Sequence, residues 1–209
     1  MINDPLLNRL TFALACLVVV GIVKLVASEV TRFRRKQEIA QLAEQLNLVF
    51  ETDQLRSEEL VHKRYCDFSL VANNVASTFT NLMVSRTDDV KLSLFDYGYC
   101  KRSLFDSEQD MPDIFQTVLA IETPQFELSF RLGTEGDRNA EMIKCVPPKL
   151  MNLIDANPQY CFEGIGNMMW VYEDQVLQSP TQYSKLIQLG HDVCESVVAD
   201  RARRTATLS

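Results

Sequence analysis

The longest apolar run of the chain lies near its start. From Leu10 to Val23 the only polar side chain is Thr11, and after Lys24 the run continues to Ala27. Eighteen helical residues rise about 27 Å, close to the ~30 Å of a hydrocarbon core. Asp4-Pro5 is a suitable helix start and adds length. The pattern predicts an amino-terminal tail and transmembrane helix within residues 1–28.

Two alternatives to a membrane anchor are a buried soluble helix and a cleaved signal peptide. A soluble amphipathic helix would show a polar face, which residues 12–23 lack. A signal peptide has support from the small residues of Val26-Ala27-Ser28. However, the basic residues follow the apolar run, and positive charge resists translocation. This charge favours a single-pass anchor with the amino terminus outside and the rest of the chain in the cytoplasm.

Residues 29–48 predict a basic juxtamembrane turn followed by a helix. Helical periodicity is set by Ile39, Leu42, Ala43 and Leu46. The basic residues that we expect at the membrane surface are Arg32, Arg34, Arg35 and Lys36. Anionic lipids attract such residues. We favour the alternative that these basic residues only determine topology over recognition of a specific lipid. The apolar spacing of this segment does not support a coiled coil.

The middle of the chain predicts antiparallel strands with one buried face. Strands at 79–85 and 90–97 flank a polar turn at 86–89. A second pair is expected at 115–122 and 125–132, around Thr123-Pro124. The strand 125–132 alternates most clearly, because four apolar residues share one face. These are Phe126, Leu128, Phe130 and Leu132.

The remaining pattern predicts two helices around a third hairpin. A short helix begins at Pro147-Pro148 and runs through Ile154. Strands at 160–163 and 168–172 follow, and Ser179-Pro180 opens a final helix whose apolar stripe should cover the sheet. We therefore expect an α+β globular domain at 49–203, with an antiparallel sheet and helices packed on one face, and a flexible tail at 204–209.

Charge divides the chain into two parts. The formal net charge is −7, yet residues 1–36 carry six basic and two acidic side chains, which leaves the body strongly acidic. An acidic body lacks the basic excess that phosphates attract, so we expect no nucleic-acid partner. The lipid bilayer is the expected partner, together with a possible protein partner. The oligomeric state is left open.

The cysteines indicate free thiols in a reducing compartment. Cys16 lies in the apolar run, and the other five have no CxxC spacing. An odd number does not suit a disulfide framework. The five are Cys66, Cys100, Cys145, Cys161 and Cys194.

Candidate catalytic or metal-binding residues are few. His62 and His191 each have acidic or thiol neighbours one helical turn away, but neither set matches a metal or nucleophile motif. Gly164-x-Gly166 fits a hairpin turn better than a phosphate loop. The acidic loop 103–113 could converge on a divalent cation, although it lacks EF-hand spacing and fits a solvated loop better. We therefore expect no catalytic residue, metal or cofactor.

A last candidate site lies on the expected second strand. Tyr97 and Tyr99 should share one face of this strand, with Asp96 on the opposite one. They could line a groove for a ligand or partner. An aromatic sheet face covered by the last helix is the favoured alternative.

The stretch Phe95-Asp96-Tyr97-Gly98-Tyr99 also carries a resemblance. Together with the segment 42–50, Asn74-Val75 and 124–128, it resembles a family of uncharacterised bacterial single-pass membrane proteins with an FDY strand. The resemblance implies a cytoplasm-facing domain at the inner membrane and assigns no activity. The sequence thus favours a noncatalytic interaction or accessory domain. A membrane-tethered domain that binds a small molecule or lipid is the alternative, and a hydrolase is a distant third.

Overall fold

A computed structural model describes residues 5–51, 65, 67–72, 74–87, 89–101, 114–133 and 146–207. The chain divides into two units, Met1–Gln41 and Leu42–Ser209. His62, Cys66, Cys145 and the acidic loop 103–113 lie outside the described residues, as does the side chain of Cys100.

The amino-terminal helix is continuous from the apolar run through the basic turn. Helix α1 spans Pro5–Gln45, 41 residues, or about 60 Å. It ends in a Schellman motif, because the Leu48 N–H bonds to Ala43 O and the Asn47 N–H to Glu44 O while Asn47 has a φ of 53°. Residues 29–45, for which a basic turn and a helix were expected, continue the helix of the apolar run without a break.

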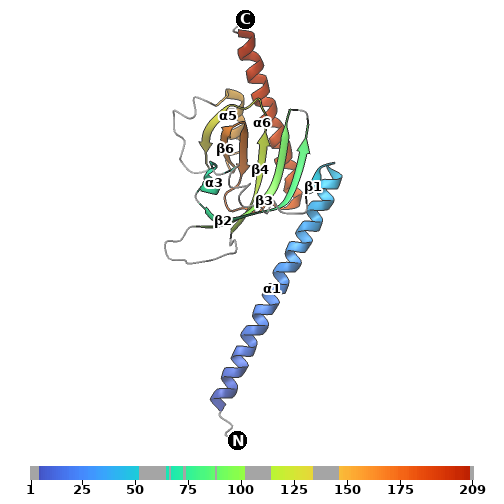
Figure 1. Cartoon of the computed structure of the whole chain (residues 1–209), viewed down its shortest axis with the longest axis vertical. Helices are drawn as coiled ribbons and strands as arrows, with labels where there is room; N and C mark the ends of the chain where they lie inside the picture. Colours follow the sequence, from blue (N-terminus) through green and yellow to red (C-terminus); the bar gives the residue numbers. More distant parts are fainter. Residues whose placement is uncertain are drawn as a thin grey trace. The chain divides into compact units, whose positions relative to one another are not determined.

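Among the described residues, seven strands form one sheet in which every neighbouring pair is antiparallel. Figure 1 shows the arrangement of the sheet. Their order across the sheet is β1-β2-β3-β4-β7-β6-β5. The strands are β1 Val49–Glu51, β2 Asn74–Arg86, β3 Lys91–Lys101, β4 Ile114–Glu122, β5 Leu128–Leu132, β6 Cys161–Gly166 and β7 Met168–Tyr172. The expected α+β class with an antiparallel sheet is confirmed, as are the hairpins β2–β3 and β6–β7.

The expected pairing of residues 115–122 with 125–132 is wrong. Strand β4 pairs with β3 and β7, while β5 lies at the edge and, of the strands that the structure describes, pairs with β6 alone. All five residues of β7 are buried, whereas Ser129 and Arg131 of β5 are exposed. A fully apolar strand suits the centre of a sheet, and a strand with a polar face suits its edge.

The centre of the sheet is buried on both faces, which corrects the expectation of one buried face. Six consecutive residues of β4 are buried. Helix α6, Pro180–Thr207, packs on β3 and β4, and α5, Pro148–Ala156, packs against α6. The four-residue helix α3, Ser69–Ala72, lies on the other face, where it contacts β2. Helix α6 includes residues 204–207 of the expected tail.

The edge strand β5 confirms the expected alternation. Leu128, Phe130 and Leu132 are buried. Phe130 lies directly opposite Gly164 of β6, and a Cβ on Gly164 would lie 2.8 Å from Phe130 Cε1. The ring therefore occupies space that only a glycine leaves open.

Phe130→Ala should lower the free energy of unfolding by about 3 to 5 kcal/mol, because it removes a buried ring and leaves a cavity over Gly164. The matched change Ser129→Ala on the exposed face should alter it by about 0.5 kcal/mol or less. Urea titration of the full-length chain in detergent, followed by Trp170 fluorescence, measures both. Equal midpoints would contradict the packing of Phe130.

Candidate functional site

Asp96 is the centre of a buried hydrogen-bond network between the sheet and α6. Its side chain is 2% exposed. Tyr183 OH and Thr117 Oγ1 donate to Asp96 Oδ1 at 2.9 and 3.0 Å, and Asn81 Nδ2 donates to Oδ2 at 2.8 Å. Asn81 lies in an irregular part of β2 with a φ of 56°. The β2 irregularity, β3, β4 and α6 are thus joined through one carboxyl group.

The network continues into the segment that connects β7 to α6. The Gln178 N–H donates to Thr117 Oγ1 at 3.0 Å, and the Thr117 N–H donates to Val176 O at 3.1 Å. Gln175 N–H likewise donates to Gln116 Oε1 at 3.0 Å. These bonds hold the connecting segment against β4 and so fix where α6 begins. The buried Asp96 carboxyl group is thus surrounded by side chains of β2, β4 and α6.

The two tyrosines lie on the opposite face of β3, so the expected division of the three residues between faces is confirmed. Tyr97 and Tyr99 are 0% and 2% exposed, which places them inside the domain. Tyr97 OH donates to Leu70 O at 3.3 Å. The expectation that the last helix covers this aromatic face is wrong: α6 packs on the Asp96 face. The tyrosine face is covered instead by a short segment before β2.

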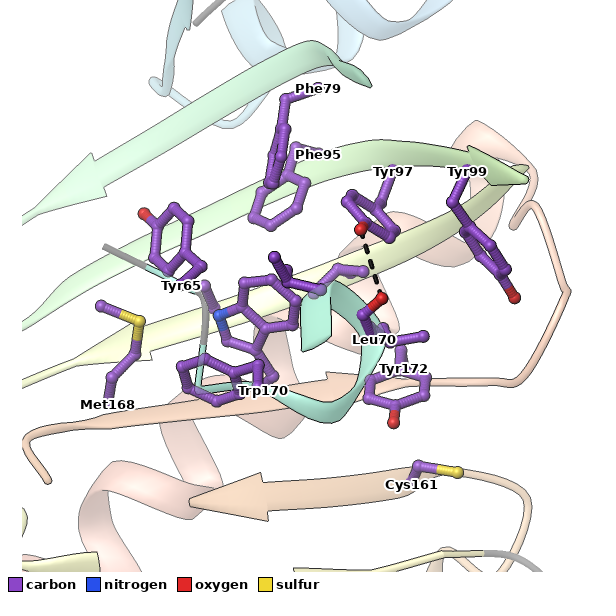
Figure 2. Packing of buried hydrophobic residues seen from close by; sticks show 14 residues of the cluster. Tyr65, Leu70, Phe79, Phe95, Tyr97, Tyr99, Cys161, Met168, Trp170 and Tyr172 are labelled. Carbon is purple, nitrogen blue, oxygen red and sulfur yellow. Dashed lines mark hydrogen bonds between the residues drawn. The ribbon is translucent and has the colours of Figure 1, made fainter. Parts of the chain in front are cut away.

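We call this segment the strap and define it as Tyr65 and residues 67–72. Its side chains enter a cluster of buried aromatic residues around Trp170, which is 0% exposed (Figure 2). The Phe68 ring stacks on Trp170 with a centroid distance of 4.4 Å and an interplanar angle of 13°. Tyr65 lies 5.2 Å from Trp170. Among the described residues, Trp170 Nε1 has no hydrogen-bond partner.

A buried carboxyl group fastens the strap to the sheet. Glu163 of β6 is 4% exposed, and its Oε1 and Oε2 accept from the Ser69 N–H and Oγ at 2.8 and 2.7 Å. Burial raises the pKa of the neighbouring Tyr172 hydroxyl, while its hydrogen bond with Ser69 opposes that rise. Sequence reasoning missed Glu163, whose signal was a lone charge inside an otherwise uncharged strand. It also missed Ser69 and Trp170.

The basic residues Arg32, Arg34, Arg35 and Lys36 all lie on α1. Arg32, Arg34 and Lys36 are exposed, and Arg35 is partly buried. Arg32 forms a solvent-exposed ion pair with Glu29 at 3.5 Å. Such a pair contributes little to stability, so these charges remain suited to contact with a charged surface.

The remaining candidates do not assemble into a site in the described part of the chain. His191 is exposed on α6, whereas Cys194, one turn away, is buried. No group of three metal-ligating side chains occurs among the described residues. Gly164 and Gly166 belong to the β6–β7 hairpin, where Gly166 has a φ of 58°. Cys16, Cys161 and Cys194 are thiols that take part in no disulfide within the described residues.

No family model, no curated protein sequence and no solved structure matches this chain.

Tyr183→Phe should lower the free energy of unfolding by about 1 to 3 kcal/mol, because it removes one donor from the buried Asp96 carboxyl group. Tyr160→Phe is the matched control, since Tyr160 is half-buried and lies outside this network. It should change the value by about 0.5 kcal/mol or less. Urea midpoints of the full-length variants measure both effects. A Tyr183→Phe variant as stable as the control would contradict a structural role for the network.

Burial raises the pKa of Cys194 from 9.0 to about 11. At pH 8 its thiolate population should be roughly 100-fold below that of an unfolded cysteine, so alkylation should be slowed by at least this factor. The folded state keeps this proton to a higher pH than the unfolded chain does. The contribution of the thiol to the free energy of unfolding is therefore constant below about pH 9 and falls between about pH 9 and 11. Mass spectrometry of alkylated peptides, native against denatured, measures the rate. Equal rates would contradict the burial.

Proposed function

We propose that this chain is a single-pass membrane protein of the bacterial inner membrane, with a noncatalytic interaction or accessory domain in the cytoplasm. The observation that carries the proposal is the exposure of the apolar side chains of α1. Its large apolar residues from Phe12 to Val26 are 53–71% exposed. Among the described residues, this helix is long and apolar enough to cross a membrane. A continuous apolar surface of this kind is costly in water and stable in lipid.

The distribution of charge supports the cytoplasmic orientation. Arg32, Arg34, Arg35 and Lys36 follow the apolar stretch by five to nine residues, or roughly 7 to 13 Å of helix, which suits the headgroup region. Basic residues are retained on the cytoplasmic side. Residues 37–209 carry 15 basic and 26 acidic side chains, and this acidic body is repelled by anionic headgroups. It therefore favours a partner with a basic surface over the lipid surface itself.

The use of buried polar groups supports a noncatalytic role. Asp96 and Glu163 both accept hydrogen bonds from groups that hold secondary structure elements together. The described histidine, His191, is exposed and lies apart from the buried thiol of Cys194. The charged groups of the described interior are thus committed to packing. The resemblance to uncharacterised bacterial membrane proteins agrees with this proposal.

Fusions to the carboxyl terminus test the orientation. Green fluorescent protein fused after Ser209 should fluoresce in bacterial cells, and alkaline phosphatase fused there should be inactive, because the latter needs the periplasm. The fusion should stay in the membrane fraction after alkaline carbonate extraction. Active phosphatase, or a soluble product that begins near Ser28, would contradict the proposal and favour a signal peptide.

The basic cluster provides a matched control. Changing Arg32, Arg34, Arg35 and Lys36 to Glu should raise the phosphatase activity of the fusion, because the charge that retains this side is gone. Changing Arg201, Arg203 and Arg204 to Glu should leave the activity low, because those residues lie far from the span.

A further inference from the structure

We propose that α1 pairs in parallel with α1 of a second copy of this chain, along one face that extends from the membrane span into the basic segment. We call this face the α1 stripe. Its apolar side chains are spaced alternately four and three residues apart: Phe12, Cys16, Val19, Val23, Val26, Val30 and Phe33. This spacing is typical of two helices that wrap around each other. The inference rests on the membrane anchor proposed above and names the partner of that helix.

The α1 stripe continues past the end of the apolar run. Beyond Ala27 the helix becomes polar and basic, and of residues 28–36 only Val30 and Phe33 are apolar. They lie four and seven residues after Val26, so the three side chains share one face, and they are 45–61% exposed in the single chain. Lipid tails solvate apolar side chains in the bilayer core, but Val30 and Phe33 lie among charged residues at its surface. A second helix along the stripe would remove them from water.

Charges at the two edges of the α1 stripe favour a second copy in parallel orientation. In a parallel pair, the residue that precedes a stripe position on one helix faces the residue five positions later on the other helix. Glu29 precedes Val30 and would therefore face Arg34 of the second copy. The Glu29 side chain is 65% exposed beside Arg32 of its own chain, so a second guanidinium group can reach it. Twofold symmetry would form this ion pair twice.

The other basic residues of α1 do not oppose a parallel pair. Lys24, Arg32 and Arg35 fall more than about 100° around the helix from the centre of the α1 stripe, on its far side. Lys36 lies at an edge of the stripe, where it would face the neutral Gln41 of the second copy. The parallel arrangement therefore places no like charges directly opposite each other.

The α1 stripe is a different face from the one that carries Ile39. Ile39 lies six residues after Phe33, which is about 120° around the helix. The seven-residue repeat that leads back from Ile39 reaches Arg32 and Arg35, whereas the repeat that ends at Phe33 has no charged residue at its seven positions. Ile39 is 0% exposed in the single chain, while Phe33 is 61% exposed. The face that remains available to a second copy is therefore the α1 stripe.

Small side chains flank the α1 stripe within the apolar run. Ala13, Ala15 and Ala27 each lie next to a residue of the stripe in the sequence and at its edge on the helix. Small residues let the backbones of two membrane helices approach closely, and close packing drives the association of helices in lipid. The edges of the stripe thus permit the contact that its charges favour.

Disulfide formation tests the pairing, because Cys16 belongs to the α1 stripe. Bacterial membranes that contain the full-length chain are oxidised with copper phenanthroline, and the dimer is measured on non-reducing gels. The parent chain should form a dimer that the Cys16→Ser chain lacks. Adding Val19→Cys to Cys16→Ser should restore the dimer, because position 19 lies on the stripe. The matched change Val18→Cys, about 100° around the helix from position 19, should not restore it.

Exchange of the two charges tests the parallel register. At low expression, where crosslinking through Cys16 is partial, Glu29→Arg should lower the crosslinked fraction roughly threefold to tenfold, because it places like charges opposite each other. Arg34→Glu should lower it by a similar factor for the same reason. Combining both changes restores opposite charges and should recover crosslinking. Arg35→Glu, on the far side of the helix, is the matched control and should leave it unchanged.

A parent chain that resists alkaline carbonate extraction yet forms no dimer through Cys16 would overturn the pairing and leave the membrane anchor standing. A chain absent from the extracted membranes would overturn the anchor and the pairing together. Equal crosslinking through positions 18 and 19 would mean that lipid covers the stripe and that chains meet at random, which also overturns the pairing. Single charge variants that crosslink like the parent chain, or a combined variant that crosslinks no better than either, would overturn the parallel register.

Discussion

The fold depends on one constraint: at the centre of the sheet, both faces are buried and neither is exposed to solvent. In β4 and β7 the side chains on both faces are buried, so a polar group there is costly unless it has a partner within the protein. Asp96 illustrates the constraint, because three side chains from β2, β4 and α6 donate to its two oxygens. Removing one donor leaves the others around a group that water cannot reach. The position of α6 is therefore fixed by a directional hydrogen bond to Asp96 as well as by apolar contacts.

The two faces meet this constraint in different ways. The α6 face combines apolar packing with the Asp96 network, whose hydrogen bonds have defined lengths and angles. The opposite face is filled by stacked and edge-on rings around Trp170. Ring contacts are less directional than hydrogen bonds and tolerate exchange of one ring for another of similar size. Glu163 supplies a directional contact on this face, and it holds the strap against the sheet.

Local patterns predicted the elements whose environment is visible over a few residues. The alternation of Phe126 to Leu132 identified the buried face of β5, and the polar turn at 86–89 identified the β2–β3 hairpin. The pattern did not predict the strand order, because a continuously apolar strand such as β7 shows no preference for a neighbour until the sheet is assembled. It could not place the strap either, since Ser69 and Glu163 are 94 residues apart and neither belongs to a motif. Asp96 was found by its position among aromatic residues, but its partners Asn81 and Tyr183 were not.

The two faces of the sheet differ in what the loss of a side chain would do. Loss of a donor on the Asp96 face leaves a buried acceptor with fewer hydrogen bonds and lowers stability, while apolar contacts still hold α6 on β3 and β4. Loss of a ring on the aromatic face leaves a cavity in a packed cluster, because Phe68 and Val71 of the strap are each 2% exposed. The strap is therefore part of the core, and Phe68 is expected to be as costly to remove as other buried rings. A side chain of similar size is accordingly tolerated best on the aromatic face, whereas the Asp96 face needs a side chain that can donate a hydrogen bond.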